Sequence, residues 1–138
     1  MSRTPFQQPS CCRVLLVEDN ADAGEVTALF IRASGLEVLI ASSGQVALEI
    51  AGACHPEIVL CDLKLPDMSG LDVLRAMRSQ ESIKGALLVI FNARGERDLR
   101  SLERTVDPSA VDVFLSKPIT REALDKLLSQ LHGERRRA

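Results

Sequence analysis

The sequence predicts an α/β fold in which five parallel strands form one sheet and five helices cover both of its faces. Short segments rich in valine, leucine and isoleucine alternate with segments whose apolar residues recur at helical spacing. The short segments are apolar throughout, as in strands that are buried on both faces. The length of 138 residues is that of a single domain. Together these observations predict a doubly wound parallel sheet.

The first strand is predicted at residues 13–17, before the acidic residues Glu18 and Asp19. Asn20 or Asp22 can cap the helix that follows, which runs to Ser34 before the helix-ending Gly35. Its predicted inner stripe consists of Val26, Leu29, Phe30 and Ala33.

The second strand and helix are predicted at residues 36–41 and 45–54. Ser42, Ser43 and Gly44 precede this helix, and His55-Pro56 ends it because the residue before proline avoids the α region. Its predicted core residues are Val46, Ala47 and Ile50.

The third strand, at residues 58–61, is continuously apolar and ends at Asp62. Ser69 and Asp72 have the spacing of a capping box at the start of the next helix. The remaining elements are strands at 86–91 and 111–115, a weakly amphipathic helix at 94–104 and a last helix at 120–131. The predicted apolar residues of the third and last helices are Leu71, Val73, Leu74, Met77, Leu124, Leu127, Leu128 and Leu131.

Composition excludes several classes of protein. A formal net charge of −2 gives no basic footprint for direct DNA binding. No apolar run approaches the roughly 20 residues of a membrane span, and no secretory signal pattern is present. The four cysteines have neither disulfide nor zinc-site spacing, so we expect reduced thiols in a cytoplasmic protein. They are Cys11, Cys12, Cys54 and Cys61.

Charged residues follow three of the predicted strands: Glu18 and Asp19, Asp62, and Lys117. Because the carboxyl ends of parallel strands lie on one edge of the sheet, these side chains can converge. Three neighbouring carboxylates repel one another and favour a bound cation, and an oxygen-only donor set suits Mg²⁺. Asp62 is then a competent nucleophile toward phosphorus, with Lys117 stabilising the transferred charge. The alternative is a metal-free acidic patch in which Lys117 forms a salt bridge. This alternative is less favoured because all four charged residues stand at strand ends that lie on the same edge of the sheet.

Three motifs occur in order along the chain. They are residues 14–20 (VLLVEDN), Asp62 followed by residues 65–70 (LPDMSG), and residues 116–118 (SKP). Together they resemble the receiver domain of two-component response regulators, over about residues 13–131.

The resemblance implies that Asp62 accepts a phosphoryl group from a phosphohistidine on a sensor histidine kinase or a histidine phosphotransfer protein. It implies Mg²⁺ as the cofactor, held by the carboxylates of Glu18, Asp19 and Asp62 and by the backbone carbonyl of Lys64. Lys117 would contact the phosphate.

The resemblance also implies the flavodoxin-like receiver fold, with strand order 2-1-3-4-5 and a cis peptide bond before Pro118. We expect a flexible leader at residues 1–10, the receiver domain at 11–132 and a basic tail at 133–138.

The sequence departs from the family pattern after the fourth strand, where Asn92 replaces the usual threonine or serine. In the family that hydroxyl bonds the phosphoryl group while an aromatic residue, here Phe114, rotates inward. The Asn92 amide can donate a hydrogen bond to a phosphoryl oxygen, but a static role for both residues remains open. The segment between Asn92 and Lys117 is longer than usual, and the helix at 94–104 is unusually charged.

The predicted function is therefore a Mg²⁺-dependent response-regulator receiver that relays phosphoryl groups or signals by protein contact, and that is no enzyme beyond its own phosphorylation and dephosphorylation. The downstream protein is unknown, and a homodimer remains open. The alternative is a phosphorylation-independent binding module that has lost the switch at Asn92. A hydrolase is disfavoured because Lys64 stands where phosphatases with an aspartyl nucleophile commonly carry a second acid. Flavin binding is disfavoured because Glu18 and Asp19 would repel the phosphate of a flavin nucleotide.

Overall fold

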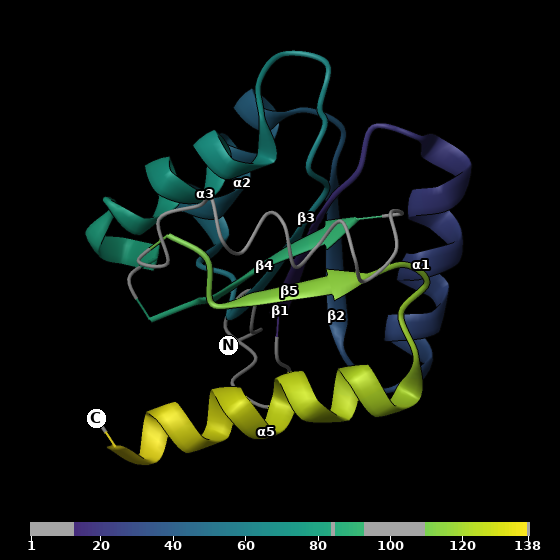
Figure 1. Ribbon diagram of the computed structural model, residues 1–138, viewed down its shortest axis with the longest axis vertical. Helices are drawn as coiled ribbons and strands as arrows, with labels where there is room; N and C mark the ends of the chain where they lie inside the picture. Colours follow the sequence, from purple (N-terminus) through teal and green to yellow (C-terminus); the bar gives the residue numbers. More distant parts are fainter. Residues whose placement is uncertain (1–12, 84, 93–109, 138) are drawn as a thin grey trace, which may run out of the picture.

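The computed structural model describes residues 13–83, 85–92 and 110–137 (Figure 1). It contains one five-stranded sheet in the order β2-β1-β3-β4-β5, and every neighbouring pair is parallel. This confirms the predicted fold class and strand order. The strands are β1 (Arg13–Val17), β2 (Glu37–Ala41), β3 (Ile58–Cys61), β4 (Leu87–Asn92) and β5 (Val113–Ser116).

Helices lie on both faces of the sheet, with α2 and α3 on one face and α1 and α5 on the other (Figure 1). The helices are α1 (Ala21–Ala33), α2 (Gly44–Cys54), α3 (Gly70–Arg78) and α5 (Arg121–Arg137), with a short 3₁₀ turn η2 (Glu81–Ile83). The helix predicted at 94–104 lies outside the described residues. The last helix is longer than expected, since it continues from Arg121 to Arg137. None of the helices in the described part of the chain is long and apolar enough to cross a membrane.

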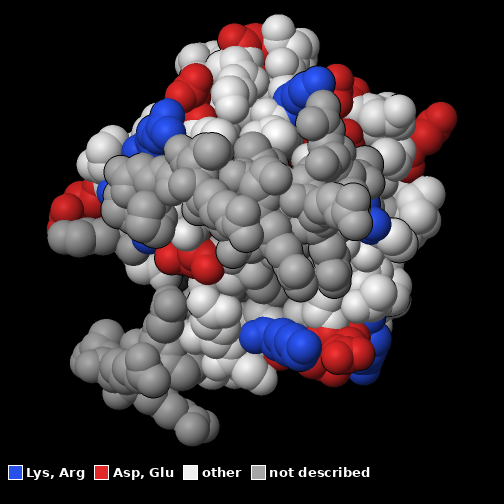
Figure 2. Space-filling view, viewed as in Figure 1, with Lys and Arg blue, Asp and Glu red and all other residues white. Residues whose placement is uncertain are grey.

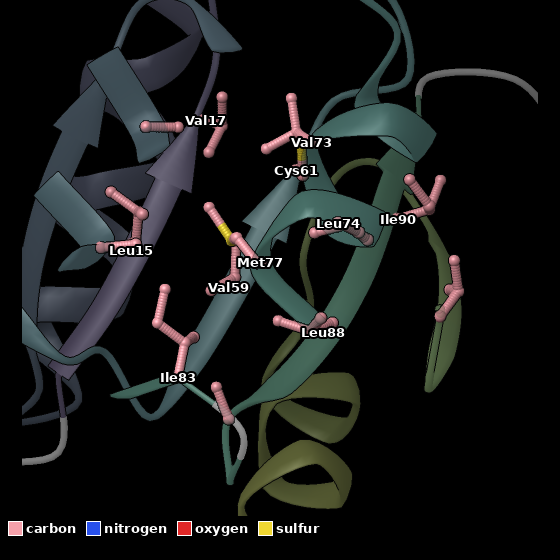
Figure 3. Packing of buried hydrophobic residues seen from close by; sticks show 14 of the residues in the cluster. Leu15, Val17, Val59, Cys61, Val73, Leu74, Met77, Ile83, Leu88 and Ile90 are labelled. Carbon is pink, nitrogen blue, oxygen red and sulfur yellow. The ribbon is translucent and has the colours of Figure 1, made fainter. Parts of the chain in front are cut away.

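The core consists of two layers, one on each face of the sheet. Figure 3 shows the layer beneath α3, where Met77 and Leu74 lie among side chains of β1, β3 and β4. The opposite layer packs against α1 and α5 and includes Leu16, Leu60 and Val89. Because successive strand residues point to opposite faces, both sets must be apolar, which explains the continuously apolar strand sequences.

The predicted inner stripe of α1 is wrong. Val26 and Leu29 are 68% and 63% exposed, and Ala33 is exposed as well. Of the four predicted residues, only Phe30 packs against the core. The observed buried stripe is Gly24, Ala28 and Ile31. Two of these three residues, Gly24 and Ala28, have small side chains, and a Cβ at Gly24 would be in van der Waals contact with Cγ of Glu18, at 3.5 Å.

Two further expectations concern helix faces. In α2, Ala47 is buried and Ile50 packs against the core as predicted, but Val46 is 37% exposed. In α5, Leu124, Leu127 and Leu131 are buried as predicted. Figure 2 shows acidic and basic side chains next to one another over α5, where Arg121 pairs with Asp125 and Lys126 with Glu122. Neither sign of charge dominates the described side chains of this helix.

The cap residues follow the sequence signals. Asn20 caps α1 by accepting a hydrogen bond from the Ala23 N–H, and Gly35 has a φ of +88°, which suits glycine after a helix end. Cys54 and Cys61 are free thiols.

Candidate functional site

The ends of β1 and β3 lie side by side and carry the first two candidate residues. Val17 and Cys61 are paired in the parallel register, so Glu18 and Asp62 emerge from neighbouring strands at the same level. Their backbones are fixed as well, since the Asp62 N–H donates to the Val17 carbonyl at 3.0 Å and the Glu18 N–H to the Ala41 carbonyl at 2.9 Å. The sheet ladder thus positions both carboxylates.

Three carboxylates gather at this edge. Glu18, Asp19 and Asp62 each offer one oxygen, and these oxygens lie within 4.8 Å of one another. The Glu18 side chain is only 5% exposed, Asp62 is partly buried and Asp19 is exposed. The cluster is therefore open to solvent on one side and walled by the sheet on the other.

Lys117 supplies the counter-charge from the end of β5. Its ammonium donates hydrogen bonds to Oε1 of Glu18 and, at 3.4 Å, to Oδ2 of Asp62. Its backbone N–H donates to the Asn92 carbonyl at 2.7 Å, which ties it to the end of β4. The peptide bond between Lys117 and Pro118 is cis.

Phe91 is a site residue that the sequence analysis missed. The Lys117 ammonium lies 5.5 Å from the centroid of the Phe91 ring, within the range of a cation–π interaction. The ring is buried in the core layer beneath α1 and α5. The aromatic position at the end of β4 was the available signal, but the sequence alone does not place the ring beneath the lysine.

The two carboxylates that share Lys117 have pKa values shifted in opposite directions. Burial raises the pKa of Asp62, and repulsion from Glu18 adds to the increase, so the attraction of Lys117 does not restore the ordinary value. Burial also raises the pKa of Glu18, but hydrogen bonds from Lys117 and the Asn20 N–H outweigh it and leave that pKa lowered. Glu18 is thus firmly ionised, and Asp62 takes up a proton more readily than an ordinary aspartate.

The loop from β3 to α3 is held close to Asp62. Oδ1 of Asp62 accepts a hydrogen bond from the Leu63 N–H at 2.9 Å, and the Gly70 N–H donates to the Leu63 carbonyl at 2.7 Å. Lys64 forms an antiparallel bridge with Ser69, and its side chain is exposed. Gly70 is required by this close approach, because a Cβ there would lie 2.0 Å from the Asp62 carbonyl oxygen.

Asn92 and Phe114, the candidate switch residues, lie on adjacent strands. Asn92 is the last residue of β4 and is buried, whereas Phe114 is partly buried and packs against the core layer beneath α2 and α3. Phe114 is paired with Ile90, two residues before Asn92, so Phe114 and Asn92 are diagonal neighbours on one face of the sheet.

The donor set fits a hard divalent cation. All three side chains offer carboxylate oxygens, which Mg²⁺ prefers. When all of these groups are ionised, the three carboxylates and the Lys117 ammonium together carry a net charge of two negative units. The burial of Glu18 and the partial burial of Asp62 make that excess costly, and a divalent cation would neutralise it.

The chain is similar to known proteins over most of its length. The sequence profile described as the response regulator receiver domain matches residues 14–129. The polar-differentiation response regulator DivK of Brucella ovis is 30% identical over 107 residues, which are 78% of this chain and 85% of that protein.

Solved structures show the same fold. A CheY-like response regulator receiver domain protein from Methanospirillum hungatei superposes with a TM-score of 0.78 at 22% identity, covering 94% of this chain and all of that one. The response regulator TrrA of Thermotoga maritima, in complex with Mg²⁺ and BeF, has a TM-score of 0.74 at 22% identity, covering 87% of this chain and 98% of that one. The chain belongs to the response regulator receiver domain family.

Proposed function

We propose that this receiver domain accepts a phosphoryl group on Asp62 from a phosphohistidine in a sensor histidine kinase or a histidine phosphotransfer protein. The reaction depends on Mg²⁺, and the signal passes on by protein–protein contact. The observation that carries the proposal is the convergence of Glu18, Asp19 and Asp62 within 4.8 Å, with the Lys117 ammonium bound to two of them.

The residues of the site divide the work of phosphoryl transfer. An Asp62 carboxylate oxygen forms the new bond to phosphorus while the bond from phosphorus to the donor histidine nitrogen breaks, and the freed imidazole keeps the electron pair. The Leu63 N–H and the Lys117 ammonium fix the orientation of the Asp62 carboxylate. Lys117 is also placed to stabilise charge on the phosphoryl oxygens.

Glu18, Asp19, Asp62 and the Lys64 carbonyl would hold the magnesium ion. When bound, Mg²⁺ would neutralise the charge that develops on the phosphoryl group during transfer. The family relative TrrA, solved with Mg²⁺ and BeF, supports this choice of cation.

Incubation with acetyl phosphate and Mg²⁺ is expected to add one acid-labile phosphoryl group to the protein, measured by intact-protein mass spectrometry. Chelation of Mg²⁺ with EDTA is expected to abolish the added mass, because the ionised carboxylates would otherwise repel the donor. Equal labelling in EDTA would contradict the magnesium role. No labelling at saturating Mg²⁺ would favour the phosphorylation-independent binding module instead.

The exposed face of α1 is a suitable docking surface for a protein donor. Asn20 caps α1 next to the carboxylates, and Val26 and Leu29 lie roughly 9 and 13 Å further along at a rise of about 1.5 Å per residue. They are the two most exposed large apolar side chains in the described part of the chain. A donor protein that brings its histidine to Asp62 can bury both residues.

The donor is a histidine kinase or phosphotransfer protein that labels the wild type. Transfer from this donor to the double variant Val26→Glu, Leu29→Glu is expected to be slower by about tenfold or more, because two apolar contacts are lost. Labelling by acetyl phosphate should stay within twofold, since that small donor needs no docking surface. The matched control is Val46→Glu on α2, which is expected to leave both rates unchanged. Equal slowing with both donors would contradict the docking role.

A further inference from the structure

We propose that Asp67 is a positioning residue for the metal site, because it fastens the β3–α3 loop, residues 62–69, to the first turn of α2. The inference rests on the proposed function, since it assigns to that loop the task of presenting the Lys64 carbonyl to Mg²⁺. Asp67 itself is exposed and belongs to no candidate ligand set.

Both carboxylate oxygens of Asp67 are used in this contact. Oδ1 accepts a hydrogen bond from the Gly44 N–H at 2.8 Å, and Oδ2 accepts one from the Gln45 N–H at 2.9 Å. These N–H groups belong to the first turn of α2, where no partner within the helix is available. The two hydrogen bonds lower the pKa of Asp67, so the side chain is ionised at neutral pH.

Besides satisfying two N–H groups of α2, the contact joins two segments that are distant in the sequence. Ser43 already caps α2, since its hydroxyl oxygen accepts a hydrogen bond from the Val46 N–H at 3.2 Å. Asp67 approaches the same turn from a loop more than 20 residues further along the chain. The bonds therefore fix the loop relative to the helix.

Met68 makes a second contact with the same turn. A Cβ at Gly44 would lie 2.4 Å from Cγ and Sδ of Met68 and 2.9 Å from Cγ2 of Val73. Only a glycine at this position lets Met68 lie so close to the helix backbone. Two consecutive loop residues, one charged and one apolar, thus hold the loop against α2.

The β3–α3 loop begins at Asp62, the proposed phosphoacceptor. The base of the loop is closed by the hydrogen bond from Gly70 to Leu63 and by the bridge between Lys64 and Ser69. Asp67 lies between these closures, three residues after Lys64, and anchors the part of the loop that projects from the sheet. Without this anchor, metal binding would have to order the loop, and that ordering would weaken affinity.

The test compares Asp67→Ala with Asp67→Asn and with the control Ser43→Ala. The Ser43 variant removes a cap bond from the same turn of α2 without touching the loop. Three quantities are measured for the wild type and for each variant. They are the Mg²⁺ dissociation constant by calorimetry, the rate of labelling by acetyl phosphate as a function of Mg²⁺ concentration, and the melting temperature without Mg²⁺.

Asp67→Ala is expected to weaken Mg²⁺ binding about tenfold, because metal binding would then have to order the loop. The Mg²⁺ concentration for half-maximal labelling should rise by the same factor, while the rate at saturating Mg²⁺ stays within twofold. Asp67→Asn keeps one carbonyl acceptor and should lie between Asp67→Ala and the wild type. It also keeps the test decisive if the alanine variant does not fold.

Ser43→Ala should lower the melting temperature and leave Mg²⁺ binding unchanged. Wild-type Mg²⁺ affinity in both Asp67 variants would overturn the positioning role and leave the proposed function standing. Equal weakening by Ser43→Ala would also overturn it, because the effect would then follow helix stability. A wild-type protein that neither binds Mg²⁺ nor takes a label would overturn the proposed function itself.

Discussion

Asp62→Asn is expected to take no phosphoryl label from acetyl phosphate, because a neutral amide oxygen is a far weaker nucleophile than a carboxylate. Intact-protein mass spectrometry at saturating Mg²⁺ measures the loss. The matched control is Asp72→Asn on α3, an exposed aspartate that pairs with Arg75 and is not one of the clustered carboxylates; this variant should label as the wild type does. A label on the Asp62 variant equal to that of the wild type would move the phosphoacceptor elsewhere.

The same substitution is expected to raise the melting temperature at pH 7 in Mg²⁺-free buffer. Burial and repulsion from Glu18 raise the pKa of Asp62 above its value in the unfolded chain. A carboxyl group with a raised pKa holds its proton more tightly when folded, so its contribution to stability falls as the pH rises from the unfolded value through the folded one. The neutral amide removes that loss at pH 7.

The pH dependence separates this effect from a packing change. Below pH ~4, near the ordinary pKa of an aspartate, the wild-type carboxyl group is protonated in both states and the difference in melting temperature should shrink. Added Mg²⁺ should stabilise the wild type more than the variant, because one carboxylate ligand is missing from the variant. A variant less stable than the wild type at pH 7 would show that the Asp62 pairing with Lys117 outweighs the charge burial.

The sequence predicts the sheet and the charged cluster well because both follow from local rules. Continuously apolar segments predict buried parallel strands, and the ends of such strands lie on one edge. The register that pairs Val17 with Cys61 then brings Glu18 and Asp62 together, without any need to know how side chains pack.

The features that the sequence did not predict depend on contacts between distant segments. The inner face of α1 was assigned to the large residues Val26 and Leu29, yet the helix buries Gly24, Ala28 and Ile31 instead. The contact of Asp67 with the first turn of α2 likewise joins segments that no periodicity relates. Tertiary packing decides which stripe of a helix is buried. Helical spacing alone fits two stripes of α1 equally well.

Gly70→Ala is expected to destabilise the fold by on the order of 3 kcal/mol, the upper range for overpacking a buried position. The new Cβ would lie 2.0 Å from the Asp62 carbonyl oxygen, 3.0 Å from the Asp62 carbonyl carbon and 3.1 Å from Cα of Leu63. These are backbone atoms of the strand end and the loop, so no flexible side chain can move aside. Chemical denaturation measures the loss, and the fraction that remains folded should bind Mg²⁺ more weakly because relief of the clash displaces Asp62.

The control is Gly52→Ala, the same chemical change inside α2. A Cβ at Gly52 would meet only Oε1 of Gln80 at 3.8 Å, an ordinary van der Waals distance. Because alanine is the better helix former, this variant is expected to gain about 1 kcal/mol and to bind Mg²⁺ as the wild type does. A Gly70→Ala protein as stable as the wild type would show that α3 can move away from Asp62 without loss. The close approach of α3 to Asp62 would then not be a requirement of the site.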